Sequence, residues 1–386
     1  MNRFDDMVNE LRKDVEIPES VWQKYTSTFA NLKDQQSQNS RHAFSRKRVW
    51  PAIAAFFIIS TVSISAAAHM RWSQGLEQKL HPTPKQRLQL EENQMASFVG
   101  KSVTQGDVTV TVHQSIVDNN FAYLSFKVEG YQLEDGKEPG FSDISIAVDH
   151  EKEASGGWSA SFYDGLIQGA DGKMMQSDGT PLAEGESPSY MMEDGSMEFQ
   201  VMMMNSRKGA FIDRPIHVEL RDLGVYEEKA GEVAVDAQGT WTFDWVLSGN
   251  EAVEQHQLNA CLQGSDAIVQ SVELSPVSIS ITYEFPRNLE TVPGIDENGV
   301  EMEHGLLQEP PAFTGVRLKD GTMHIGISNG LASSNYVDQE SEIYESKVAL
   351  ARVIDVDQVE SLLFIKSYPE GEEPLQEENL YIVPIN

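Results

Sequence analysis

The run from Val49 to Ala68 constrains this chain more than any other feature, because none of its twenty residues is charged. As an α-helix it would be about 30 Å long, which matches the hydrocarbon thickness of a bilayer. Trp50 and Trp72 stand near its two ends, where interfacial anchors are expected. A soluble core helix of this length would usually carry polar residues on its outer face. We therefore predict a transmembrane helix at residues 49–68.

Two other interpretations of the run remain open. Ala66 and Ala68 form the small-residue pattern of a signal-peptidase site, with a basic region upstream. Against cleavage, the apolar run exceeds the usual 7–15 residues of a signal peptide, and a long N-terminal region precedes it. A buried core helix is the third interpretation and has the least support.

The charges on either side of the run predict its orientation. The ten residues before Val49 contain four basic side chains, whereas the ten after Ala68 contain only Arg71. Because basic loops stay inside, we predict a cytoplasmic N-terminus. Residues 69–386 would then lie on the extracellular side of the cell membrane.

The charge of the chain differs sharply between its two ends. Residues 1–48 hold nine Lys and Arg against seven Asp and Glu, which gives a net charge of +2. Since the whole chain has a net charge of −31, the remaining residues carry −33. Such an acidic exterior argues against nucleic-acid binding, which needs a basic surface. Solubility outside the cell is the simplest explanation of this charge.

The N-terminal region contains two apolar stripes at helical spacing, separated by a break at Pro18. Fewer than 50 residues rarely bury a core of their own, so the stripes need a partner. The opposite face mixes acidic and basic residues, which favours a protein partner over a membrane surface. A loosely structured tail without a partner is the alternative. The candidate partner-binding residues are Phe4, Val8, Leu11, Val15, Val21, Trp22, Tyr25, Phe29 and Leu32.

Downstream of the run, residues 69–98 are rich in Gln, Lys and Glu and suggest a juxtamembrane stalk. From Gly100 the apolar residues alternate, and a period of two is typical of half-buried strands. Residues 108–112 and 124–128 predict a β-hairpin with one buried face, around the turn Asp118-Asn119-Asn120. Further alternating runs start near Arg214, Gly239 and Ser275.

These patterns predict a mainly β exterior made of two immunoglobulin-like β-sandwich domains. We place the first at residues 99–248 and the second at residues 249–386. Residues 151–196 have weak periodicity. The Met-rich stretch Met191–Asn205 fits either a core strand or an adaptable binding surface.

No sequence motif points to catalysis or to a cofactor. The nine histidines are scattered, and no phosphate-binding loop, nucleophile elbow or zinc motif is present. The single cysteine, Cys261, excludes a disulfide within the chain and fits a small buried apolar residue. We predict a protein that is not an enzyme, with no cofactor and no metal site.

Four stretches resemble the membrane-anchored proteins that carry domain of unknown function 4179, in low-GC Gram-positive bacteria. The first is SVTQGDVTVTVHQSIVDNNFAYLSFKV, and the others are GTWTFDWVLSG, VELSPVSISITYEF and DVDQVESLLFI. The last three resemble the immunoglobulin-like half of that family. Residues 151–205 have no clear counterpart.

The resemblance implies an anti-sigma factor. Its N-terminal helices would hold an extracytoplasmic-function sigma factor away from RNA polymerase, and its exterior would sense an envelope signal through an unknown extracellular ligand. Since residues 1–48 contain no cysteine, the zinc pattern of another anti-sigma class is absent. The competing hypothesis is a surface-exposed binding or adhesion protein with no regulatory partner.

Overall fold

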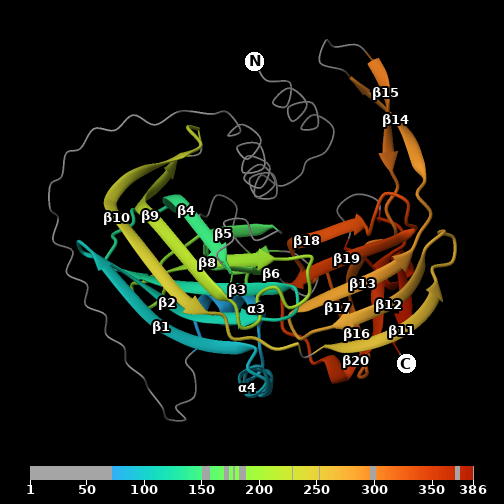
Figure 1. Cartoon of the computed structure of the whole chain (residues 1–386), viewed down its shortest axis with the longest axis horizontal. Coiled ribbons are helices and arrows are strands. Elements are labelled where there is room, and N and C mark those ends of the chain that lie inside the picture. The colour runs from blue at the N-terminus through green and yellow to red at the C-terminus, as the bar shows by residue number, and fades with distance from the viewer. Residues whose placement is uncertain are drawn as a thin grey trace. The chain divides into compact units, whose positions relative to one another are not determined.

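The computed structural model describes residues 72–149, 157–168, 174–176, 179–181, 188–227, 229–251, 253–295, 301–369 and 374–385. They form a mainly β protein (Figure 1). The predicted cytoplasmic region and the predicted span at residues 49–68 lie outside these ranges. Within the described ranges, no helix has both the length and the apolarity needed to cross a membrane. The described residues divide into two compact units, the short stretch Leu289–Leu306 and the remainder.

The larger unit begins with two short helices. They are α3 (Gln74–Leu80) and α4 (Pro84–Glu92). Thr83 caps α4 with a capping box shared with Gln86, and Pro84 occupies the first turn, where its missing N–H is tolerated. The turn between the helices passes through His81, which has a left-handed backbone with φ of 46°.

The first module consists of two antiparallel sheets. The first sheet has the order β1 (Ala96–Gln105), β2 (Val108–Val117), β3 (Phe121–Glu129), β8 (Met197–Met204) and β5 (Trp158–Phe162). The second has the order β10 (Glu232–Val246), β9 (Pro215–Glu227) and β4 (Pro139–Val148). A small separate hairpin pairs β6 (Leu166–Gln168) with β7 (Met174–Gln176).

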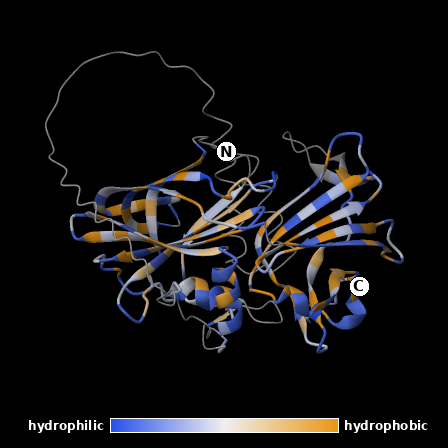
Figure 2. Cartoon of the chain, turned by 60° about the horizontal axis from the view of Figure 1, so that its bottom comes forward, coloured by the Kyte–Doolittle hydropathy of each residue, from blue (hydrophilic) through white to orange (hydrophobic). Residues whose placement is uncertain are grey.

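One hydrophobic core fills the space between the two sheets of the first module. The strands alternate polar and apolar residues, as the blue and orange bands of Figure 2 show. The predicted inward residues of β2, β3, β9 and β10 are buried, which confirms the period-two interpretation of these strands. The Met-rich stretch forms core strand β8, with Met197, Phe199, Val201 and Met203 buried.

The β2–β3 hairpin differs from its prediction because both of its faces are buried near the turn. Gln114, Ser115 and Ser125 have no exposed surface, although the sequence predicted only one buried face for this hairpin. The outer face of this hairpin is covered by α3, α4 and residues of the second module. Alternation in the sequence shows which residues share a face, but it does not show that a second layer covers the polar face.

The second module also consists of two sheets around a core. One has the order β11 (Glu254–Cys261), β12 (Ile268–Leu274), β13 (Ser278–Glu284), β19 (Ile343–Leu350) and β18 (Ser328–Tyr336). The other has the order β17 (Met323–Ile325), β16 (Phe313–Leu318), β20 (Val359–Ile365) and β21 (Leu380–Pro384). Short 3-10 turns precede β20 and β21, at Val356–Gln358 and Glu377–Asn379.

The prediction that Cys261 is buried is wrong, because its side chain is exposed. Cys261 lies at the end of β11, which forms an edge of its sheet. Alternation along β11 turns Leu258 and Ala260 toward the core and Cys261 toward solvent.

The smaller described unit is a β-hairpin of β14 (Leu289–Ile295) and β15 (Glu301–Leu307). Leu289 and Leu306 are 69% and 58% exposed. A two-stranded ribbon has no second layer to bury such side chains.

Candidate functional site at the junction of the two modules

The residues predicted to bind a partner, from Phe4 to Leu32, lie outside the described residues. The described residues nevertheless contain an extensive buried junction. It joins the first module, the second module and the helix pair that follows the predicted span. We take this junction as the candidate functional site, because it joins both modules to the residues that follow the predicted span.

A third hydrophobic cluster forms the centre of the junction. The helix pair contributes Leu76, Leu80 and Leu90, which are almost completely buried, and Trp72 precedes them. The other members come from β2, β3, β8 and the second module, and they include Ile116, Phe121, Tyr123, Val277, Ala349 and Val353. Residues 72–98, which the sequence suggested as a stalk, are therefore largely packed into the folded unit. Their apolar residues are few and widely spaced, so the Gln- and Glu-rich composition did not reveal that they are buried.

Asp118 in the β2–β3 turn joins the two modules through its carboxylate. One oxygen, Oδ1, accepts from the backbone N–H groups of Asn120 (3.0 Å) and Phe121 (2.9 Å). The other, Oδ2, accepts from the hydroxyls of Ser275 (2.7 Å) and Ser278 (2.5 Å) in the second module. Asp118 has no exposed surface, so these donors replace the water that a carboxylate would otherwise require.

Tyr123 makes a second polar connection beside the first. Its hydroxyl lies 3.1 Å from the carbonyl oxygen of Val277 and 3.2 Å from that of Leu350. The Asn329 amide donates to the same hydroxyl at 3.1 Å. Burial raises the pKa of Tyr123, and the nearby charge of Asp118 raises it further. Tyr123 therefore stays neutral, and its hydroxyl can donate a hydrogen bond to a carbonyl oxygen of the second module.

Glu198 of β8 holds the N-terminus of α3. Its carboxylate accepts from the backbone N–H groups of Gly75 (2.6 Å) and Leu76 (3.0 Å) and from the Ser73 hydroxyl (3.1 Å). Ser73 provides no side-chain cap of its own, so Glu198 satisfies N–H groups that the first turn leaves free. A negative charge at a helix N-terminus also interacts favourably with the helix dipole.

Gln114 and Gln200 complete the contact around α3. The side-chain oxygen of Gln114 accepts from the backbone N–H of Ser73 at 2.9 Å, and the Gln200 amide donates to Glu198 at 2.9 Å. The polar side chains that bind the start of α3 thus come from β2 and β8 of the first sheet. The chain is fixed to the first module directly after the predicted span.

The turn between the two helices and the start of α4 contact the second module. The backbone N–H of Val353 donates to the carbonyl of Leu80 at 2.7 Å, and the Gln86 amide donates to the carbonyl of Val353 at 3.3 Å. Lys85 forms an ion pair with Asp355 at 3.1 Å. Consequently, the helix pair touches both modules, with its start on the first and its turn on the second.

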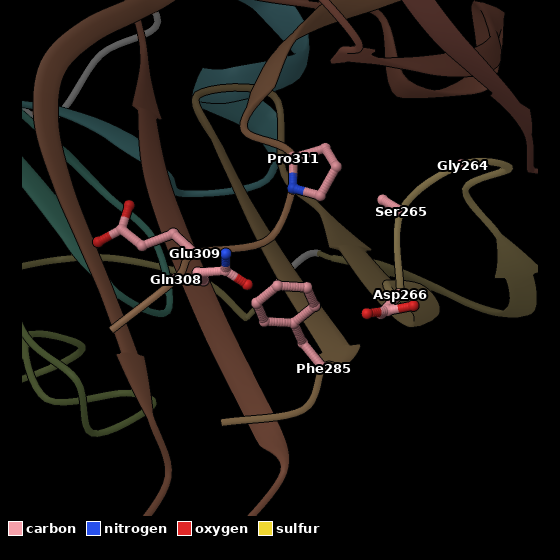
Figure 3. Close-up of a pocket in the computed structure, with 7 residues that line it drawn as sticks. All are labelled: Gly264, Ser265, Asp266, Phe285, Gln308, Glu309 and Pro311. Carbon is pink, nitrogen blue, oxygen red and sulfur yellow. The ribbon is translucent and has the colours of Figure 1, made fainter. Parts of the chain in front are cut away.

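A shallow hollow of about 360 Å³ lies elsewhere on the second module (Figure 3). It is lined by Gly264, Ser265, Asp266, Phe285, Gln308, Glu309 and Pro311. The Ser265 hydroxyl is engaged in its own turn, where it donates to the carbonyl of Leu262. The lining contains no histidine, lysine or cysteine. Across the described ranges, no group of three or more His, Cys, Asp or Glu side chains could hold a metal ion.

A comparison with known families matches part of the junction. Residues 44–130 match the family described as Domain of unknown function (DUF4179). The chain carries a DUF4179 domain. This confirms the family resemblance seen in the sequence, over a unit that runs from the basic flank of the predicted span to the end of β3. The DUF4179 domain therefore includes both helices, Asp118 and Tyr123, whereas Glu198 and the second module lie beyond the match.

No curated protein matches the chain. Among solved structures, a conserved domain protein from Bacillus anthracis is 13% identical and covers 76% of this chain and 91% of its own. Its TM-score of 0.35 does not establish a shared fold.

The sequence alone did not single out Asp118, Tyr123 or Glu198. Asp118 looked like an ordinary turn residue, and Glu198 looked like a solvent-facing residue of a strand. The available signal was weak. Polar residues in the β2–β3 hairpin and in β8 flank apolar ones, but their burial depends on helices and strands that are distant in the chain.

Proposed function

We propose that this chain is a single-pass membrane regulator of the anti-sigma-factor type. The observation that carries the proposal is the extent of the DUF4179 match, from residue 44 to residue 130. It joins the predicted span, the helix pair and the first three strands in one family unit. A unit built in this way connects a membrane segment to a folded exterior without a flexible stalk.

The junction supports the idea that the exterior passes a signal to the span. α3 begins shortly after Ala68 and is bound by Glu198, while the turn after α3 is bound to the second module. A ligand or stress that shifts the modules against each other would change the contacts of the helix pair. The proposed signal thus reaches the membrane through α3.

We also propose that each module is an immunoglobulin-like sandwich. Supporting this, each module has two antiparallel sheets that enclose one core, with five and three strands in the first and five and four in the second. The modules would lie outside the cell, where one of them would bind an unknown extracellular ligand. No enzymatic activity, cofactor or nucleic-acid contact belongs to this proposal.

On the cytoplasmic side, the two apolar stripes of residues 1–48 would bind the sigma factor. The test is co-purification of the full chain with each extracytoplasmic-function sigma factor of the source organism. We expect one stable complex, which is lost in Leu11→Asp or Trp22→Ala, because each change removes an apolar anchor.

A matched control is Glu10→Gln, which changes the polar face of the same helix and should keep the complex. If no sigma factor co-purifies with the wild-type chain, the anti-sigma proposal fails and the surface-binding alternative gains support. Equal binding by Leu11→Asp and the wild type would show that the apolar stripes are not the binding site.

A further inference from the structure

The outer face of the first sheet carries a row of polar side chains beneath the start of α3. Cross-strand pairing aligns Gln114 of β2 with Ser125 of β3, and Ser125 with Gln200 of β8. Directly paired residues of neighbouring antiparallel strands lie on the same face of the sheet. Gln114 and Ser125 have no exposed surface, and Gln200 is 4% exposed. The row is therefore shielded from bulk solvent.

Two polar groups of this row lack a hydrogen bond. Within the part of the chain that the structure describes, Nε2 of Gln114 and Oγ of Ser125 have no partner. The orientation of the Gln114 amide is fixed, because its Oε1 accepts from the backbone N–H of Ser73 at 2.9 Å. A rotated amide would point the Nε2 donor at that N–H. Gln114 therefore needs an acceptor, and the Ser125 hydroxyl needs a partner that accepts or donates.

The surrounding side chains are engaged elsewhere. The Gln200 amide nitrogen donates to Oε1 of Glu198 at 2.9 Å. The same Oε1 accepts from the Ser73 hydroxyl and from the backbone N–H of Leu76. An amide and a hydroxyl buried without any partner would destabilise the fold, because each has lost its hydrogen bonds to water.

A third unpaired group lies on the same face of the sheet. The backbone N–H of Tyr163 donates to the carbonyl of Glu198 at 2.8 Å, so the two residues are neighbours across the sheet. Phe162 belongs to the core of the first module, and alternation therefore directs Tyr163 to the outer face. The Tyr163 hydroxyl is buried and has no hydrogen-bond partner among the described residues. The polar layer beneath α3 thus contains more donors and acceptors than its own side chains pair.

We propose that an ordered water molecule binds between Gln114 and Ser125 and completes the contact of α3 with the first sheet. Buried waters typically bond to about three otherwise unpaired polar groups. Water both accepts and donates, so one molecule can accept from Nε2 of Gln114 and bond to the Ser125 hydroxyl. This inference concerns the folded exterior and stands whether or not a sigma factor binds the N-terminus.

Other small ligands do not fit this site. A metal cation would face the hydrogen atoms of the Gln114 amide nitrogen, which is only a donor. An anion would be repelled by the carboxylate of Glu198 in the same buried layer.

Urea unfolding of the full chain tests the proposal with the variant Ser125→Ala. If the hydroxyl binds the water, its removal should lower the urea concentration at the midpoint of unfolding, by about 0.3 M or more. Removal of a hydroxyl that is buried without any partner should instead leave the midpoint unchanged or raise it. That second outcome would overturn the proposal.

Ser161→Ala is the matched control. Ser161 pairs with Gln200 at the end of the same row, on edge strand β5, and its side chain is exposed. The midpoint of this variant should equal that of the wild type, so it reports the effect of a serine-to-alanine change in a strand. A fall as large as that of Ser125→Ala would also overturn the proposal.

A double-mutant cycle with Gln114→Met tests whether the two groups share one ligand. Gln114→Met removes the other partner of the water, so Ser125→Ala should then lower the midpoint by less than half as much. Full additivity of the two changes would overturn the proposal. A crystal structure of the full chain gives a readout that needs no variant. It should place a water within hydrogen-bond distance of both Nε2 of Gln114 and Oγ of Ser125, and a direct bond between these two atoms would overturn the proposal.

Discussion

The carboxylate of Asp118 accepts two hydrogen bonds from its own turn and two from serine hydroxyls of the second module. The turn bonds fix the position of the side chain, so little further ordering is needed when the hydroxyls approach it. Hydrogen bonds to a charged acceptor are the stronger kind, at about 1.5–3 kcal/mol each. At the scale of single residues, Asp118 is therefore a strong polar link between the modules.

Asp118→Ala should destabilise the protein by about 3 kcal/mol or more, since it leaves two hydroxyls and two buried N–H groups without their acceptor. Urea unfolding of the full chain measures this change as a lower urea concentration at the midpoint of unfolding. Asp107→Ala, at an exposed aspartate between β1 and β2, is the matched control and should change stability by less than about 0.5 kcal/mol. Equal midpoints for the two variants would contradict the role of Asp118.

At the scale of elements, α3 is too short to be stable by itself and depends on the first sheet. Gly75 makes this dependence specific. A Cβ atom at position 75 would lie 2.8 Å from the Glu198 carboxylate and 2.8 Å from the Gln200 amide nitrogen. Only glycine lets the first turn of α3 approach β8 this closely.

Gly75→Ala should therefore displace α3 from Glu198, with a cost of about 1–3 kcal/mol for overpacking. Hydrogen exchange at pH 7.5 would record it as faster exchange of amides 75–80, by about tenfold. Gly157→Ala is a suitable control, because its new Cβ would meet its nearest neighbour, a Met204 carbon, at 3.7 Å. Unchanged exchange in Gly75→Ala would show that α3 is not held by this contact.

Sequence patterns predicted the strands better than they predicted the junction. Alternation located the inward faces of β2, β3, β9 and β10, because burial between two sheets leaves a period of two. It failed for α3 and α4, whose few apolar residues are not arranged as an amphipathic stripe. It also failed for Glu198 and Asp118, whose burial depends on partners far away in the chain.

Exposure of Cys261 was missed for a related reason. A lone cysteine is more often buried than exposed, so composition favoured a core position. The alternation along β11 places Leu258 and Ala260 against the core and so turns the side chain of Cys261 outward.

At the scale of the whole molecule, the account requires the chain to cross the membrane once. The apolar run predicts the span, and the basic residues before it favour a cytoplasmic N-terminus with both modules outside. The junction then lies next to the extracellular surface of the cell membrane. Each part of the proposed function depends on this topology.

Labelling of the single cysteine in intact cells tests the topology most directly. Cys261 is exposed on the second module and is the only cysteine of the chain, so a membrane-impermeant maleimide reports its side of the membrane. As a matched control, Ser37→Cys in a Cys261→Ser background places the thiol in the predicted cytoplasmic region. We predict that Cys261 is labelled in intact cells and the control only after lysis. Labelling of Cys261 only after lysis would contradict the account.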